Sequence, residues 1–96
     1  MTTEELEALF EKHDELTWGD ASEVGPTKRR DLNGFLLLEK LLPGEGDIVC
    51  GAGHDEIFLD ATLEDLAKVA TEEDVMNLIR CGVRIDENRE GLAMYA

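Results

Sequence analysis

The chain has 96 residues, of which 23 are acidic and 9 basic, for a formal net charge of −14. This length allows one small domain with one core, and 43% apolar residues predict a globular rather than a disordered chain. The charge argues against direct binding of nucleic acid or of an anionic membrane surface, because both need clustered Lys and Arg. We therefore expect a single acidic domain over residues 1–96.

The first predicted helix runs from Thr3 to Leu16. Thr2 and Glu5 have the spacing of a capping box, and apolar residues follow at helical spacing along one face. The opposite face is acidic and carries Glu4, Glu7, Glu11, Asp14 and Glu15.

Residues 17–30 are predicted to form a loop, because they contain Gly and Pro and lack a periodic pattern. The loop ends in the chain's one basic cluster, residues 28–30. Its large aromatic residue, Trp18, either pins the loop to the core or serves as a contact residue. Loops of this length in small domains are typically functional or disordered.

A second helix is predicted from Asp31, its expected N-cap, to Leu42, before Pro43 and Gly44. Leucines cover much of its circumference. Such a wide apolar arc predicts a helix that is either central in the fold or buried in a homo-oligomer.

The remaining chain predicts a hairpin, two helices and a second hairpin. Residues 47–50 and 56–60 are the first pair of strands, separated by a glycine-rich turn at residues 51–53. Thr62 and Thr71 each precede an acidic residue by three positions, as N-caps do, and Gly82 ends the later helix. Residues 83–86 and 92–95 alternate as strands. The sequence therefore predicts an α+β domain, ordered helix-helix-hairpin-helix-helix-hairpin, with a small antiparallel sheet packed against helices.

The residues that could carry chemistry are few. Cys50, His54 and Cys81 are the plausible metal-binding set, but buried structural cysteines and a histidine in a turn explain them more simply, so no metal or cofactor is assigned. No phosphate-binding loop, dinucleotide fingerprint or esterase elbow is present. The sequence thus favours a protein that is not an enzyme. The acidic start of the chain has no signal-peptide pattern, which predicts a cytoplasmic location with free thiols.

The acids are unevenly distributed. Residues 1–23 and 54–96 each carry a net charge of −7, and residues 24–53 are neutral. Residues 62–96 have the outline of a winged helix, but its second helix begins with three acids, which would meet DNA phosphates. Acids on helix faces either keep a protein soluble or imitate a nucleic-acid backbone. The contact candidates on these helices are Glu4, Glu7, Glu11, Asp14, Glu15, Glu64, Glu72, Glu73 and Asp74.

Three segments of the C-terminal half, residues 54–60, 70–75 and 80–86, resemble small uncharacterised acidic proteins encoded by phages and prophages. The resemblance covers about the last 45 residues and brings no activity or site residue with it. It implies a location in the host-cell cytoplasm and action on host or defence machinery.

The functional hypothesis is a non-enzymatic binding protein that engages a basic protein surface of a host or nucleic-acid-handling protein, as an inhibitor or nucleic-acid mimic. The alternative is a structural or assembly protein that acts as a homodimer or larger homo-oligomer.

Overall fold

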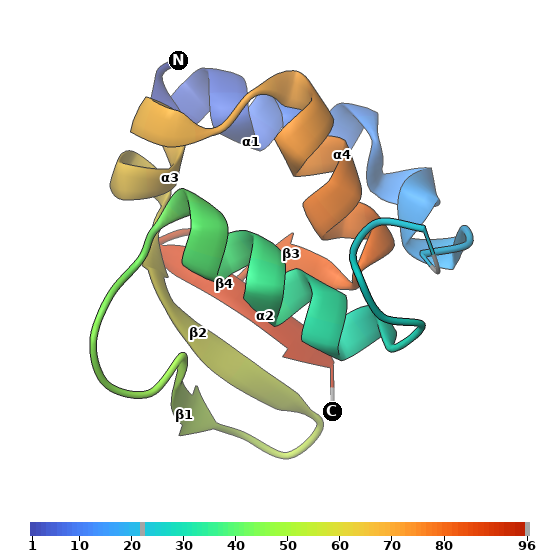
Figure 1. Cartoon of the computed structure of the whole chain (residues 1–96). Helices are drawn as coiled ribbons and strands as arrows, with labels where there is room; N and C mark the ends of the chain where they lie inside the picture. Colours follow the sequence, from blue (N-terminus) through green and yellow to red (C-terminus); the bar gives the residue numbers. More distant parts are fainter. Residues whose placement is uncertain (22, 96) are drawn as a thin grey trace.

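The chain folds as an α+β domain, as predicted, and the computed structural model describes residues 1–21 and 23–95. These residues form four α-helices, one 3-10 helix and a four-stranded antiparallel sheet (Figure 1). In chain order the elements are α1 (Thr3–Lys12), η1 (Asp14–Trp18), α2 (Arg30–Leu41), β1 (Val49–Ala52), β2 (Glu56–Thr62), α3 (Leu63–Val69), α4 (Glu72–Arg80), β3 (Val83–Ile85) and β4 (Gly91–Tyr95).

Three threonines start helices, as their spacing predicts. The hydroxyl of Thr2 accepts from the backbone N–H of Glu5, whose carboxylate accepts from the N–H of Thr2, which completes a capping box. Thr62 and Thr71 accept in the same way from the residues three positions later. At the other end of α4, Gly82 adopts a φ of 89°, the left-handed conformation that ends a helix and favours glycine.

The first helix is shorter than predicted. It ends at Lys12, because His13 leaves the helical conformation with φ −109° and ψ 18°, and a 3-10 helix follows. The expectation of one helix to Leu16 was therefore wrong. Asp14 and Glu15 lie on η1 instead of α1.

Helix α2 departs from expectation at its start, and its apolar arc is only partly buried within the chain. Arg29 occupies the N-cap position without a side-chain cap bond, and Asp31 lies inside the first turn, where it accepts from the N–H of Leu32. Leu32 and Leu36 remain 38% and 41% exposed. The buried face includes Gly34, where a Cβ would lie 3.1 Å from that of Cys81. The small residue lets α2 approach the end of α4 closely.

The sheet has the order β1-β2-β4-β3, so β1 and β3 are its edges. The first hairpin is confirmed, but β1 includes residues 51 and 52, which were predicted to turn. The second hairpin is confirmed, although β3 ends at Ile85, one residue before its predicted end. One face of the sheet supplies core residues: Ile57, Leu59, Val83, Ile85, Leu92 and Met94.

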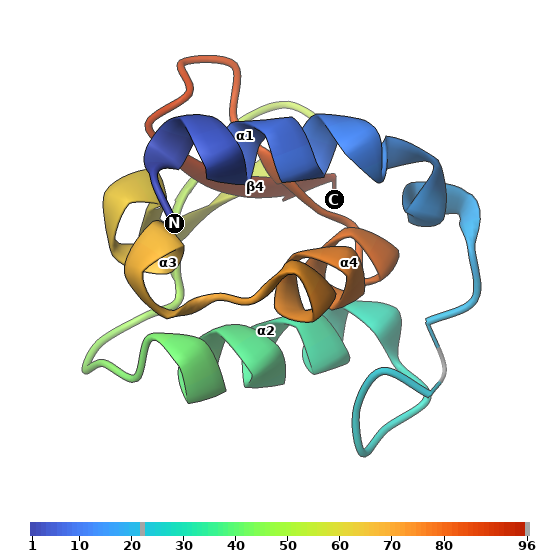
Figure 2. The same ribbon diagram turned by 90° about the horizontal axis from the view of Figure 1, so that it is seen from above.

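The first and last parts of the chain lie side by side. Helix α2 crosses one face of the sheet (Figure 1), and α4 lies between α1 and α2 when the molecule is seen from above (Figure 2). Helix α1 also contacts α3 and β3. The core that joins these elements contains Leu6, Leu66, Val75, Leu78 and Ile79. As a result, the two acidic regions of the sequence meet in the folded molecule.

Candidate functional site

A groove of about 410 Å³ lies between α1 and the β3–β4 hairpin. Its apolar lining comes from the buried side of α1, from α4 and from β3, and its polar lining comes from both walls. The apolar residues are Phe10, Ile79, Val83 and Ile85, and the charged ones are Glu7, Glu11, Asp14, Arg84, Asp86, Glu87 and Arg89.

The wall formed by α1 follows from helical spacing. Phe10 is buried in the core, and Glu7 and Glu11, four positions apart, lie beside it on the same edge of the helix. Asp14, at the start of η1, continues the row. Burial of the apolar face of α1 therefore places three carboxylates along the groove.

The opposite wall is the turn between β3 and β4. Asp86 organises this turn, because its backbone N–H donates to the carbonyl of Gly91 and its carboxylate accepts from the N–H of Glu90. Arg89 adopts a φ of 56° in the turn. Its guanidinium Nη1 lies 3.4 Å from Oε2 of Glu7, across the groove. The side chain of Arg89 is 70% exposed, so this ion pair contributes little to stability.

The charge of the groove is negative. Five carboxylates and two guanidiniums line it. One of those guanidiniums, Arg84, is paired with Glu56 and lies 4.3 Å from the centre of the Tyr95 ring, on the face of the sheet away from the core. The carboxylate of Glu7 contacts Arg89, and that of Asp86 accepts from the N–H of Glu90. Each carboxylate keeps further lone pairs that can accept hydrogen bonds from a ligand. Such a groove can hold ammonium or guanidinium groups over an apolar floor.

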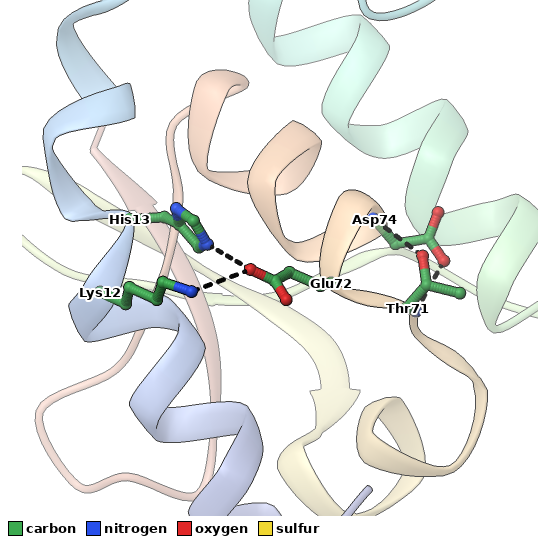
Figure 3. A network of polar contacts seen from close by, with 5 residues as sticks. All are labelled: Lys12, His13, Thr71, Glu72 and Asp74. Atoms are coloured by element: carbon green, nitrogen blue, oxygen red, sulfur yellow. Dashed lines mark hydrogen bonds and ion pairs between the residues drawn. The ribbon is translucent and has the colours of Figure 1, made fainter.

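The acids of α4 have structural partners that the sequence pattern did not reveal. Oε2 of Glu72 lies 2.8 Å from Nε2 of His13 and 3.4 Å from Nζ of Lys12 (Figure 3). These contacts lower the pKa of Glu72 below its ordinary value, and the hydrogen bond with His13 has the largest effect. Asp74 completes a capping box with Thr71. Both acids therefore have contacts within the protein, and Asp74 serves as part of a helix cap.

The other contact candidates are dispersed. Glu73 lines a separate depression beside Asn77 and Arg80, and Glu64 lies 3.9 Å from Lys68 one turn along α3. Glu4 and Glu15 are exposed and line none of the cavities described here. The fold thus brings Glu7, Glu11 and Asp14 together with residues 84–89, which the sequence had marked only as a strand and turn.

The cysteines and His54 do not converge. Cys50 is exposed on the edge strand β1, and Cys81 is fully buried at the end of α4. Within residues 1–21 and 23–95, no group of three His, Cys, Asp or Glu side chains is arranged to hold a metal ion. Burial raises the pKa of the Cys81 thiol.

No family model, curated protein or solved structure matches the chain. Among the described residues, no helix combines the length and apolar character needed to cross a bilayer.

Proposed function

We propose that this protein is a non-enzymatic binding module that takes up a basic segment of a partner protein in the groove between α1 and the β3–β4 hairpin. The observation that carries the proposal is the meeting of Glu7, Glu11 and Asp14 with Asp86 and Glu87 across one groove. These carboxylates come from the two acidic regions of the sequence. They surround an apolar floor, which suits the aliphatic stem of Lys or Arg below its charged head.

The charge of the whole chain supports the same proposal. A net charge of −14 attracts a basic partner over distances longer than the groove itself. Complementary charge makes association fast and sensitive to salt. A basic surface that normally binds nucleic acid is a fitting target, and in that case the protein would act as an inhibitor by nucleic-acid mimicry. The resemblance to phage-encoded proteins favours a host protein as this target.

The test compares two variants of equal charge. One carries Glu7→Gln, Glu11→Gln and Asp14→Asn in the groove, and the control carries Glu4→Gln, Glu15→Gln and Glu64→Gln outside it. A partner captured from host lysate at low salt is identified and then titrated against each purified variant. We expect the groove variant to lose about tenfold or more in affinity, equivalent to about 1.4 kcal/mol, and the control to lose much less. Equal losses would contradict a role for the groove.

A second candidate function is self-assembly, which the edge strand β1 favours. Its residues are mostly exposed, and an uncovered edge presents unpaired backbone groups that can pair with a second copy. The other edge, β3, lies beside α1 instead. Light scattering over a range of concentrations tests this candidate, and a strict monomer at high concentration would exclude it.

A further inference from the structure

The chain's one tryptophan and one tyrosine lie at the same pocket. This pocket, of about 460 Å³, is distinct from the acidic groove and lies between η1, the start of α2 and the end of β4. Trp18 is 89% exposed and Tyr95 70% exposed. Trp18 therefore does not pin the loop to the core, which was one of the two roles expected for it.

Hydrogen bonds fix the backbone beside Trp18, and a side-chain contact holds the ring of Tyr95. The N–H of Gly19 donates to the carbonyl of Leu16, and the carbonyl of Thr17 accepts from Nη2 of Arg30 at 2.7 Å. These bonds fix the chain on both sides of Trp18. The ring of Tyr95 lies against the guanidinium of Arg84, which is itself paired with Glu56. Two large aromatic side chains are thus presented to solvent from ordered positions.

Arg30 completes the rim of the pocket. Its guanidinium lies over Gly82, where an added Cβ would come within 3.3 Å of Nε. Trp, Tyr and Arg are the residue types that dominate binding energy in protein interfaces. Their convergence on one pocket marks an interaction site more specifically than the scattered apolar residues that are normal on any surface.

The exposed lining indicates what the pocket accepts. Met94 and Cys81 are buried behind it, so Trp18, Tyr95 and Arg30 provide the accessible contacts. Guanidinium groups lie over ring faces, and aromatic rings pack against one another in stacked or edge-to-face pairs. An aromatic side chain satisfies both kinds of contact, whereas an aliphatic one satisfies neither specifically.

The pocket adjoins the acidic groove. Thr17 lines both, and Tyr95 and Arg84 together line a third depression that reaches Glu87 in the wall of the groove. A single extended segment can therefore occupy both sites. We infer that the partner's segment carries an aromatic anchor residue that enters the Trp18–Tyr95 pocket while its basic residues lie in the groove. This inference rests on the proposed function and specifies its partner.

The test uses synthetic peptides and the native fluorescence of Trp18. One peptide series contains lysines, a glycine spacer of increasing length and one phenylalanine, and the matched series has alanine in place of phenylalanine. Binding is measured by the anisotropy of a label on the peptide. We expect the best phenylalanine peptide to bind about tenfold or more tightly than its alanine match and to shift the emission of Trp18. The shift reports burial of the exposed indole.

Two variants make the result specific. Tyr95→Ala should remove the preference for phenylalanine and leave lysine-dependent binding in place. Leu36→Ala truncates an exposed apolar residue outside the pocket. It should change neither the preference for phenylalanine nor the lysine-dependent binding. The circular dichroism of both variants establishes that they remain folded.

The outcomes separate this inference from the proposed function. Equal binding of both peptide series with unchanged Trp18 emission would overturn the aromatic anchor and leave the acidic groove as the binding site. A preference for phenylalanine that survives Glu7→Gln, Glu11→Gln and Asp14→Asn would support the pocket and contradict the proposed function. If neither peptide series binds, the inference is overturned.

Discussion

His13 and Glu72 join the end of α1 to the start of α4, with Nε2 of the imidazole 2.8 Å from Oε2 of the carboxylate. Lys12 adds a second contact to the same oxygen at 3.4 Å. The residues are 59 positions apart in the sequence. The contact lies where the two acidic regions of the chain meet, at the end of the helix that forms one wall of the groove.

This contact predicts a pH-dependent stability. The pKa of Glu72 is lowered in the folded protein from its ordinary 4.5, first by the hydrogen bond from His13 and then by Lys12. A carboxyl group whose pKa is lowered by folding stabilises the fold at pH values above its unfolded-state pKa. This stabilisation is lost as the pH falls through the folded-state pKa. Glu72→Gln should therefore destabilise the protein at neutral pH, and its difference from the wild type should shrink as the pH falls below 4.5. Urea unfolding across this range measures the effect.

Glu73→Gln is the matched control for Glu72→Gln. It removes the same charge from the same helix end and leaves the contacts of Glu72 with His13 and Lys12 intact. At neutral pH, Glu73→Gln should lower the free energy of unfolding by less than Glu72→Gln does. A loss for Glu72→Gln that is constant between neutral and acidic pH would contradict the contribution assigned to this contact.

The capping box of α4 predicts a local stability loss. Thr71 and Asp74 exchange side-chain-to-backbone hydrogen bonds of 2.9 and 3.2 Å. Thr71→Ala removes the hydroxyl acceptor and should cost about 1 kcal/mol, which lowers the melting temperature by roughly 4–8 °C for a domain of this size. Thr71→Ser keeps the acceptor and should retain most of the stability. Thermal unfolding compares them, and equal melting temperatures for both variants would refute the cap.

Asn33 is the buried anchor of the segment before α2. Its side chain is 1% exposed and donates to the carbonyl of Thr27 at 2.8 Å, while its Oδ1 accepts from the hydroxyl of Thr27 at 2.9 Å. Asn33→Ala leaves these groups unpaired and should cost about 1–3 kcal/mol. Trypsin should also cleave faster after the exposed residues Lys28 and Arg29. Asn77→Ala, which loses one contact with Arg80, is the control, and unchanged trypsin cleavage in Asn33→Ala would argue against the anchor.

The two thiols should differ in reactivity. Cys50 is exposed and Cys81 is fully buried, with its pKa raised by that burial. Because the thiolate is the reactive form, iodoacetamide should modify Cys50 in the native protein and Cys81 only after denaturation. Mass spectrometry of the labelled peptides measures both rates. Comparable labelling of the two cysteines under native conditions would be inconsistent with the packing of Cys81 against α2.

The features best predicted from the sequence are those that depend on residues close together in the chain. Thr2, Thr62 and Thr71 start helices because the bonds of an N-cap join residues three positions apart, and that spacing is visible in the sequence. The second hairpin followed from strict alternation. The end of α1 and the close approach of α2 to α4 were not predicted, because His13 meets a residue of α4 and Gly34 meets Cys81. Periodicity within one helix contains no information about such neighbours.

The candidate site divides in the same way. The sequence by itself determined the acidic character, the α+β class and the acids along one edge of the first helix, since composition and helical spacing suffice for these. Only the tertiary structure decided that Glu7, Glu11 and Asp14 face residues 84–89, and that Trp18 and Tyr95 share a pocket. The reason is physical: these pairings arise when α1, α4 and the sheet bury their apolar faces against one another, which brings together side chains far apart in the chain.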